Sequence, residues 1–128
     1  MKLAAVVLVA ATLAAPAALA KEGVVARLQN PATLRSPAGT RVALIWTLRA
    51  GKQQFGASGV YVRLRGRSGA VSTAFAATLG PGRYRARVVI PRGGVGSIAI
   101  GLEGWSSSPT GTHRADVSFP IANDPTRS

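Results

Sequence analysis

The chain has 128 residues, and its 16 Lys and Arg outnumber its 4 Asp and Glu, which gives a formal net charge of +12 at pH 7. This length suffices for one domain, so an enzyme with separate cofactor and substrate domains is excluded. The hydrophobic share of 47 % is too high for a disordered chain, and the absence of cysteine excludes disulfides. Packing alone must therefore stabilise the domain.

The beginning of the chain has the pattern of an export signal. A basic start is followed by the apolar stretch Leu3–Leu13 and by the small-residue pair Ala18 and Ala20, which is the site that signal peptidase accepts. We expect cleavage before Lys21 and an exported protein, either periplasmic or extracellular. The alternative is an uncleaved anchor helix, which Pro16 disfavours.

After the leader, apolar and polar residues alternate with a period of two, which is typical of β-strands. Seven segments show this pattern: Val24–Gln29, Arg41–Arg49, Val60–Arg65, Val71–Ala77, Arg83–Ile90, Ile98–Leu102 and Val117–Ile121. Gly- and Pro-rich turns separate them. The alternation places Trp46 and Phe75 on the apolar, inward faces and Tyr61 on the outward face.

Seven short strands separated by turns predict an all-β fold, an immunoglobulin-like antiparallel β-sandwich, with a small barrel as the alternative. We therefore divide the chain into a signal peptide (1–20), a sandwich domain (21–122) and a frayed C-terminal tail (123–128).

Two stretches resemble a known family. The segment Gly82–Pro91 has the form G-x-Y-x-A-x-V-x-x-P, and the strand entry at Pro37–Val42 has the form P-x-G-x-x-V. Both are similar to bacterial exported immunoglobulin-like domains, including the YtkA-like group. The resemblance implies the fold rather than a function. Related copper-binding sandwiches use His and Met ligands, and because the mature chain has His113 but no Met or Cys, copper binding does not carry over.

The residues that carry catalytic or metal chemistry are few. One imidazole cannot build a transition-metal site. The acidic residues, which lack the spacing of a calcium loop, are Glu22, Glu103, Asp116 and Asp124. A hydrolytic triad of His113, Asp116 and a serine from 106–108 would come from one Gly/Ser/Pro-rich loop without a nucleophile-elbow sequence. We expect a non-enzymatic protein with no cofactor and no metal.

Arginines recur at every second position in two strands: Arg63, Arg65 and Arg67, and again Arg83, Arg85 and Arg87. This spacing puts each triplet on one strand face, about 7 Å apart. If the two strands share a sheet, six guanidiniums form one surface, which suits an anionic cell-envelope polymer or another envelope protein. The alternative is a solvated face. We do not expect nucleic acid, because an exported chain does not meet the genome and the stacking aromatics are missing.

Two connections are longer than a turn requires: Ala50–Gly59, with Phe55, and Gly104–His113, with Trp105. Loops at one end of a sandwich often bind ligands, so small-molecule or peptide binding by these two aromatics is the second hypothesis. The alternative is that both rings plug the ends of the core. Our functional expectation is an exported binding module, with a structural envelope component as a further possibility.

Overall fold

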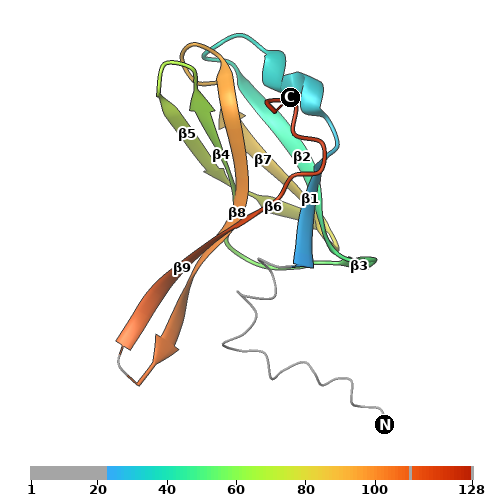
Figure 1. The fold of residues 1–128 in the computed structure, drawn as a ribbon, viewed down its shortest axis with the longest axis vertical. Helices are drawn as coiled ribbons and strands as arrows, with labels where there is room; N and C mark the ends of the chain where they lie inside the picture. The colour runs from blue at the N-terminus through green and yellow to red at the C-terminus, as the bar shows by residue number, and fades with distance from the viewer. Residues whose placement is uncertain (1–22, 110, 128) are drawn as a thin grey trace.

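The structure is a computed structural model that describes residues 23–109 and 111–127, with the side chains of 105–108 and 112–115 left aside. The expected signal peptide and its cleavage site lie outside the described residues. Two antiparallel sheets stack on one another in the described part (Figure 1). The chain is therefore an all-β, two-sheet sandwich, as the alternation of apolar residues predicts. No helix in the described part is long and apolar enough to span a membrane.

The chain contributes strands to the two sheets in alternating groups of two or three. The elements in chain order are β1 (Val24–Leu28), the 3-10 turn η2 (Pro31–Arg35), β2 (Arg41–Ala50), β3 (Gln53–Gln54), β4 (Val60–Gly66), β5 (Val71–Phe75), β6 (Ala77–Gly80), β7 (Arg83–Val89), β8 (Val95–Ser108) and β9 (Gly111–Phe119). Sheet A has the order β1-β2-β7-β6, with β3 paired to β2, and sheet B has the order β5-β4-β8-β9. The chain thus passes from one layer to the other after β3, after β5 and after β7.

The core lies between the inward faces of the two sheets. Alternate residues of β1, β2 and β7 are buried, as the period of two requires. Trp46 is 0 % exposed, which confirms its predicted place in the core. Its ring stacks on that of Tyr84, its register partner on β7, with ring centroids 6.2 Å apart. Both rings belong to the largest fully buried side chains of the described core.

The segment predicted as one strand over Val71–Ala77 changes sheets at Ala76. Here β5 ends in sheet B and β6 begins in sheet A, while the Ala76 amide donates to the Val60 carbonyl at 2.8 Å. The predicted inward position of Phe75 is wrong, since this side chain is 59 % exposed. The inward positions of β5 are the small Ser72 and Ala74. Both faces of this strand carry apolar residues, so alternation alone does not identify the buried one.

The predicted loop Gly104–His113 is wrong. Strands β8 and β9 continue as an antiparallel ladder from Ile100↔Phe119 to Ser108↔Gly111, and the hairpin extends beyond the sandwich as an arm (Figure 1). The Ser- and Gly-rich sequence of this hairpin has no alternation of apolar and polar residues. Backbone pairing does not need such alternation, so this strand is invisible to a search for alternating apolar residues.

The C-terminal segment is hydrogen-bonded to β1 through residues 120–123. The Leu28 amide donates to Asn123 Oδ1 and the Leu28 carbonyl accepts from Asn123 Nδ2, each at 2.8 Å. Ile121 forms a parallel bridge with Ala26. The segment thereby covers the free edge of β1, and covering an exposed edge hinders pairing with other chains.

Candidate functional site

The two predicted arginine triplets do not form one surface. Strand β4 belongs to sheet B, whereas β7 belongs to sheet A, so Arg63 and Arg65 face away from Arg83, Arg85 and Arg87 on the opposite side of the sandwich. The prediction that six guanidiniums form one surface is therefore wrong. Spacing along a strand fixes which residues share a face, but it does not tell which strands are neighbours.

The members of the first triplet also differ from one another. Arg63 lies over the Tyr61 ring, with its guanidinium carbon 4.6 Å from the centroid, and its Nε donates to Thr73 Oγ1 at 3.2 Å. Arg67 follows the end of β4 and donates to the Gly93 carbonyl at 3.1 Å. Arg65 is exposed on the same strand. Sheet B therefore carries no row of three equivalent cations.

Sheet A, in contrast, brings arginines from three strands together on its outward face. Its outward positions on β1, β2 and β7 are exposed and alternate with buried residues. They carry six arginines, which we call the sheet A arginine face: Arg27, Arg41, Arg49, Arg83, Arg85 and Arg87. The alternation of β1 and β2 already marks the first three as outward. The alternation does not show that β1, β2 and β7 are neighbours in this order.

The strand register sets how these arginines are spaced. Thr47 pairs with Arg27 on one side and with Arg83 on the other, so these two arginines flank a threonine in one row. Neighbouring strands lie about 4.8 Å apart, so the backbones of β1 and β7, on either side of β2, are about 10 Å apart. The next rows place Ile45 beside Arg85 and Ala43 beside Arg87. Long cationic side chains thus rise around a strip of shorter, uncharged ones.

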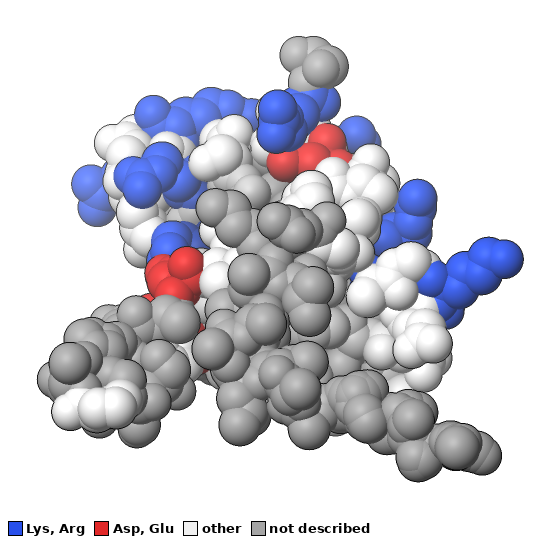
Figure 2. Space-filling model, turned by 60° about the horizontal axis from the view of Figure 1, so that its bottom comes forward, with Lys and Arg blue, Asp and Glu red and all other residues white. Residues whose placement is uncertain are grey.

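The sheet A arginine face contains no carboxylate to neutralise it. None of the five strands of sheet A has an Asp or Glu in its sequence. The described acidic residues are elsewhere: Glu103 and Asp116 pair with each other's backbone in sheet B, and Asp124 lies in the C-terminal segment. Figure 2 shows Lys and Arg side chains on opposite flanks of the described surface.

Two of these arginines flank a hollow in the surface. A cavity of about 360 Å³ is lined on β1 and β2 by Val25, Arg27, Thr47 and Arg49. The Arg49 side chain donates to the Lys52 carbonyl at 3.3 Å, and on the neighbouring row Arg83 Nε donates to Gln29 Oε1 at 3.1 Å. A guanidinium has five N–H donors, so Arg49 and Arg83 each keep further donors that can bind an anion.

Of the two aromatic side chains in the predicted loop site, Phe55 lies among the described ones and Trp105 does not. The Phe55 ring is half-buried and packs edge-on against Phe119 with centroids 5.9 Å apart. The Tyr84 hydroxyl donates to the Phe55 carbonyl at 2.9 Å and accepts from the Ala57 amide at 3.0 Å. These contacts fold 51–59 back onto the end of the core, which agrees with the plug alternative. Trp105 lies in the β8–β9 arm, and its side chain is outside the description.

Among the described residues there is no group of three or more His, Cys, Asp or Glu that could hold a metal ion.

Comparison with known proteins gives one weak structural likeness. No family model matches the sequence. No curated protein matches it. The crystal structure of a DUF4785 family protein from Legionella pneumophila is similar to this chain with a TM-score of 0.41 and 13 % sequence identity. The match covers 69 % of this chain and 26 % of that chain, so this chain spans about a quarter of that structure's length.

Proposed function

We propose that the protein is an exported, non-enzymatic binding module that engages an anionic polymer of the cell envelope through the sheet A arginine face. The observation that supports the proposal is the gathering of six arginines on three adjacent strands of a sheet whose strands contain no acidic residue. Arginine presents a planar fork of donors that matches carboxylate and phosphate groups. A broad face of such forks suits a repeating anion better than a single small one.

We also propose that the sandwich is immunoglobulin-like. Its sheet A order β1-β2-β7-β6 corresponds to the A-B-E-D sheet of that fold, and β4-β8-β9 corresponds to C-F-G. Strand β5, which pairs with β4 at the edge of sheet B, then takes the place of an added C′ strand. The fold hosts many functions, so the functional proposal rests on the arginines and not on the topology.

Two features favour a flexible acidic polymer over nucleic acid. The outward positions of β1, β2 and β7 carry no aromatic side chain, whereas binders of single-stranded nucleic acid use aromatic rings as stacking platforms. The uncharged strip of Ala43, Ile45 and Thr47 between the arginines offers no hydrogen-bond pattern for reading bases. Charge is thus the property that this face recognises.

Export belongs to the same proposal, because an envelope polymer is met only outside the cytoplasm. The apolar stretch and the Ala18-x-Ala20 pair support cleavage before Lys21. N-terminal sequencing of protein purified from its native source is expected to begin at Lys21. Native protein that retains residues 2–20 would show that the segment is not removed and would favour the anchor alternative.

A matched pair of charge variants tests the binding surface. The face variant changes Arg27, Arg49, Arg83 and Arg85 to Gln, and the control variant changes Arg63, Arg65, Arg92 and Arg127 to Gln, so both lose four positive charges. Polyglutamate of defined length serves as the probe. Exposed ion pairs contribute about 0.2–1 kcal/mol each, so the face variant should lose more than about fivefold in affinity at low salt.

The control variant is expected to keep most of the affinity. Wild-type binding should weaken steeply with added salt, because each neutralised anion releases counterions, and the face variant should show a shallower dependence. Equal losses in both variants would mean that the polymer senses only total charge, which would contradict the proposal. Thermal unfolding of each variant verifies that the fold is kept.

A further inference from the structure

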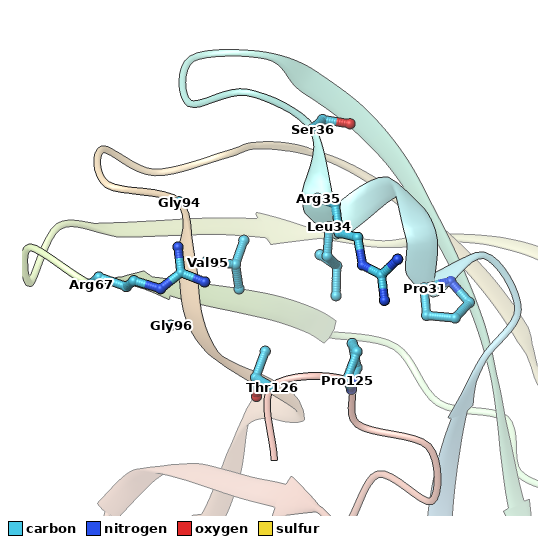
Figure 3. A pocket seen from close by; sticks show the side chains of 10 residues that line it. All are labelled: Pro31, Leu34, Arg35, Ser36, Arg67, Gly94, Val95, Gly96, Pro125 and Thr126. Atoms are coloured by element: carbon cyan, nitrogen blue, oxygen red, sulfur yellow. The ribbon is translucent and has the colours of Figure 1, made fainter. Parts of the chain in front are cut away.

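A second basic site lies at the end of the sandwich, apart from the sheet A arginine face. Four segments that are distant in the sequence meet there: η2, the turn after β4, the start of β8 and the C-terminal segment. They enclose a cavity of about 430 Å³, which lies within the range of small-molecule pockets. In Figure 3, Arg67 lies on one side of the cavity beside Val95, and Arg35 lies on the other side beyond Leu34, with its guanidinium near Pro31.

The Arg67 side chain is held in position by the β7–β8 turn. Its backbone amide donates to the Gly94 carbonyl and its Nη1 donates to the Gly93 carbonyl, both at 3.1 Å. Gly94 has a φ of +81°, and a Cβ there would come within 2.7 Å of Arg67 Nη1. The glycine therefore leaves room for the guanidinium to lie against the turn. An arginine fixed in this way loses little side-chain entropy when it binds an anion.

The rest of the lining combines apolar and uncharged polar groups. Leu34 and Val95 are buried, and Pro125 and Thr126 contribute the wall from the C-terminal segment. Among the described residues, no acidic side chain lines the cavity. The nearby Asp124 is engaged locally, because its Oδ1 accepts from both the amide and the hydroxyl of Thr126, at 2.8 and 2.6 Å. These two bonds also keep the C-terminal wall in place.

We propose that this cavity binds a small organic phosphate monoester, with the phosphate between Arg35 and Arg67 and the organic part against Leu34 and Val95. Two guanidiniums match a group that carries a charge of about −1.5 to −2 at pH 7. The apolar surface beside them favours an ester with a compact apolar group over free phosphate. The site involves none of the residues of the sheet A arginine face, so it does not depend on the proposed function.

Calorimetric titration of the whole mature protein with four probes tests this inference. The probes are phenyl phosphate, inorganic phosphate, benzoate and benzyl alcohol. We expect one site for phenyl phosphate, at least about fivefold weaker binding of inorganic phosphate and of benzoate, and no measurable binding of benzyl alcohol. Equal affinities for phenyl phosphate and inorganic phosphate would overturn the apolar part of the site. Benzoate binding as tight as phenyl phosphate would overturn the choice of phosphate.

Variants locate the binding. Arg35→Gln and Arg67→Gln should each weaken phenyl phosphate at least about tenfold, since each removes a charge-assisted pair of hydrogen bonds. Arg92→Gln removes the same charge from the neighbouring turn without touching the lining, and it should change affinity less than twofold. If Arg92→Gln has the same effect as the other two, the ester binds through net charge alone and the proposal fails. Polyglutamate binding should be unchanged in Arg67→Gln, which separates this site from the arginine face.

Discussion

At the scale of single residues, burial could be predicted where apolar and polar side chains alternate strictly. Trp46 lies in such a run and is fully buried. Phe75 does not, because Val71, Thr73 and Phe75 face out while Ser72, Ala74 and Ala76 face in. The buried side holds small residues at a point where the chain passes from one sheet to the other. Side-chain size at the crossing decides the orientation there, and the crossing itself is a tertiary feature.

Trp46 gives a test of the core. Its indole Nε1 is buried and has no hydrogen-bond partner among the described residues, which costs about 1–3 kcal/mol. Trp46→Ala should lower the free energy of unfolding by about 3–5 kcal/mol. Trp46→Phe keeps most of the ring volume and removes the unpaired donor, so its loss should stay below about 2 kcal/mol. Urea denaturation measures both, and equal losses would show that the indole nitrogen has an acceptor.

At the scale of elements, the strands of the sandwich could be predicted from the sequence, but their partners could not. Six of the seven predicted segments overlap one strand, and the seventh overlaps β5 and β6. The β8–β9 arm escapes prediction because its Ser- and Gly-rich sequence has no alternation of apolar and polar residues. The arginine face was assigned to the wrong strand pair for a related reason. A strand's neighbours depend on which layer it joins, and local alternation carries no information about layers.

Tyr61 connects three strands of sheet B and gives this sheet a pH dependence. From β4 its ring extends across Gly101 on β8, where a Cβ would lie 2.5 Å from the Tyr61 hydroxyl oxygen. The hydroxyl then donates to Asp116 Oδ1 on β9 at 2.6 Å. Burial raises the pKa of Tyr61 above its ordinary value of 10.0, and the bond to Asp116 raises this pKa further. Arg63 lowers the pKa of Tyr61, but its effect is smaller.

This raised pKa predicts a loss of stability in alkali. Above pH 10 the unfolded chain releases the Tyr61 proton while the folded chain retains it, so the free energy of unfolding falls as the pH rises. Tyr61→Phe removes this contribution. The stability difference between wild type and Tyr61→Phe should therefore be constant from pH 7 to 9 and narrow above pH 10. Urea denaturation over this range measures it, and a difference that stays constant up to pH 11 would contradict the assignment.

At the scale of the whole molecule, the two sheets divide the charge of the protein. Sheet A displays the six arginines of its face, and sheet B holds Glu103 and Asp116 together with the Tyr61 and Arg63 contacts. Composition predicts a basic protein, yet it cannot predict this division. Repulsion between unit charges about 7 Å apart in water is only about 0.6 kcal/mol before screening. The fold therefore tolerates the crowded arginines at little cost, and a polyanion can use them together.

The central claim is that sheet A, and not the protein's total charge, binds the polymer. An NMR titration of isotope-labelled mature protein with polyglutamate tests it most directly, since each backbone amide reports its own surroundings. We expect the shift changes to concentrate on β1, β2 and β7, around Arg27, Thr47 and Arg85, while β4 and β5 change little. Changes spread evenly over both sheets, or centred on Arg63 and Arg65, would contradict it.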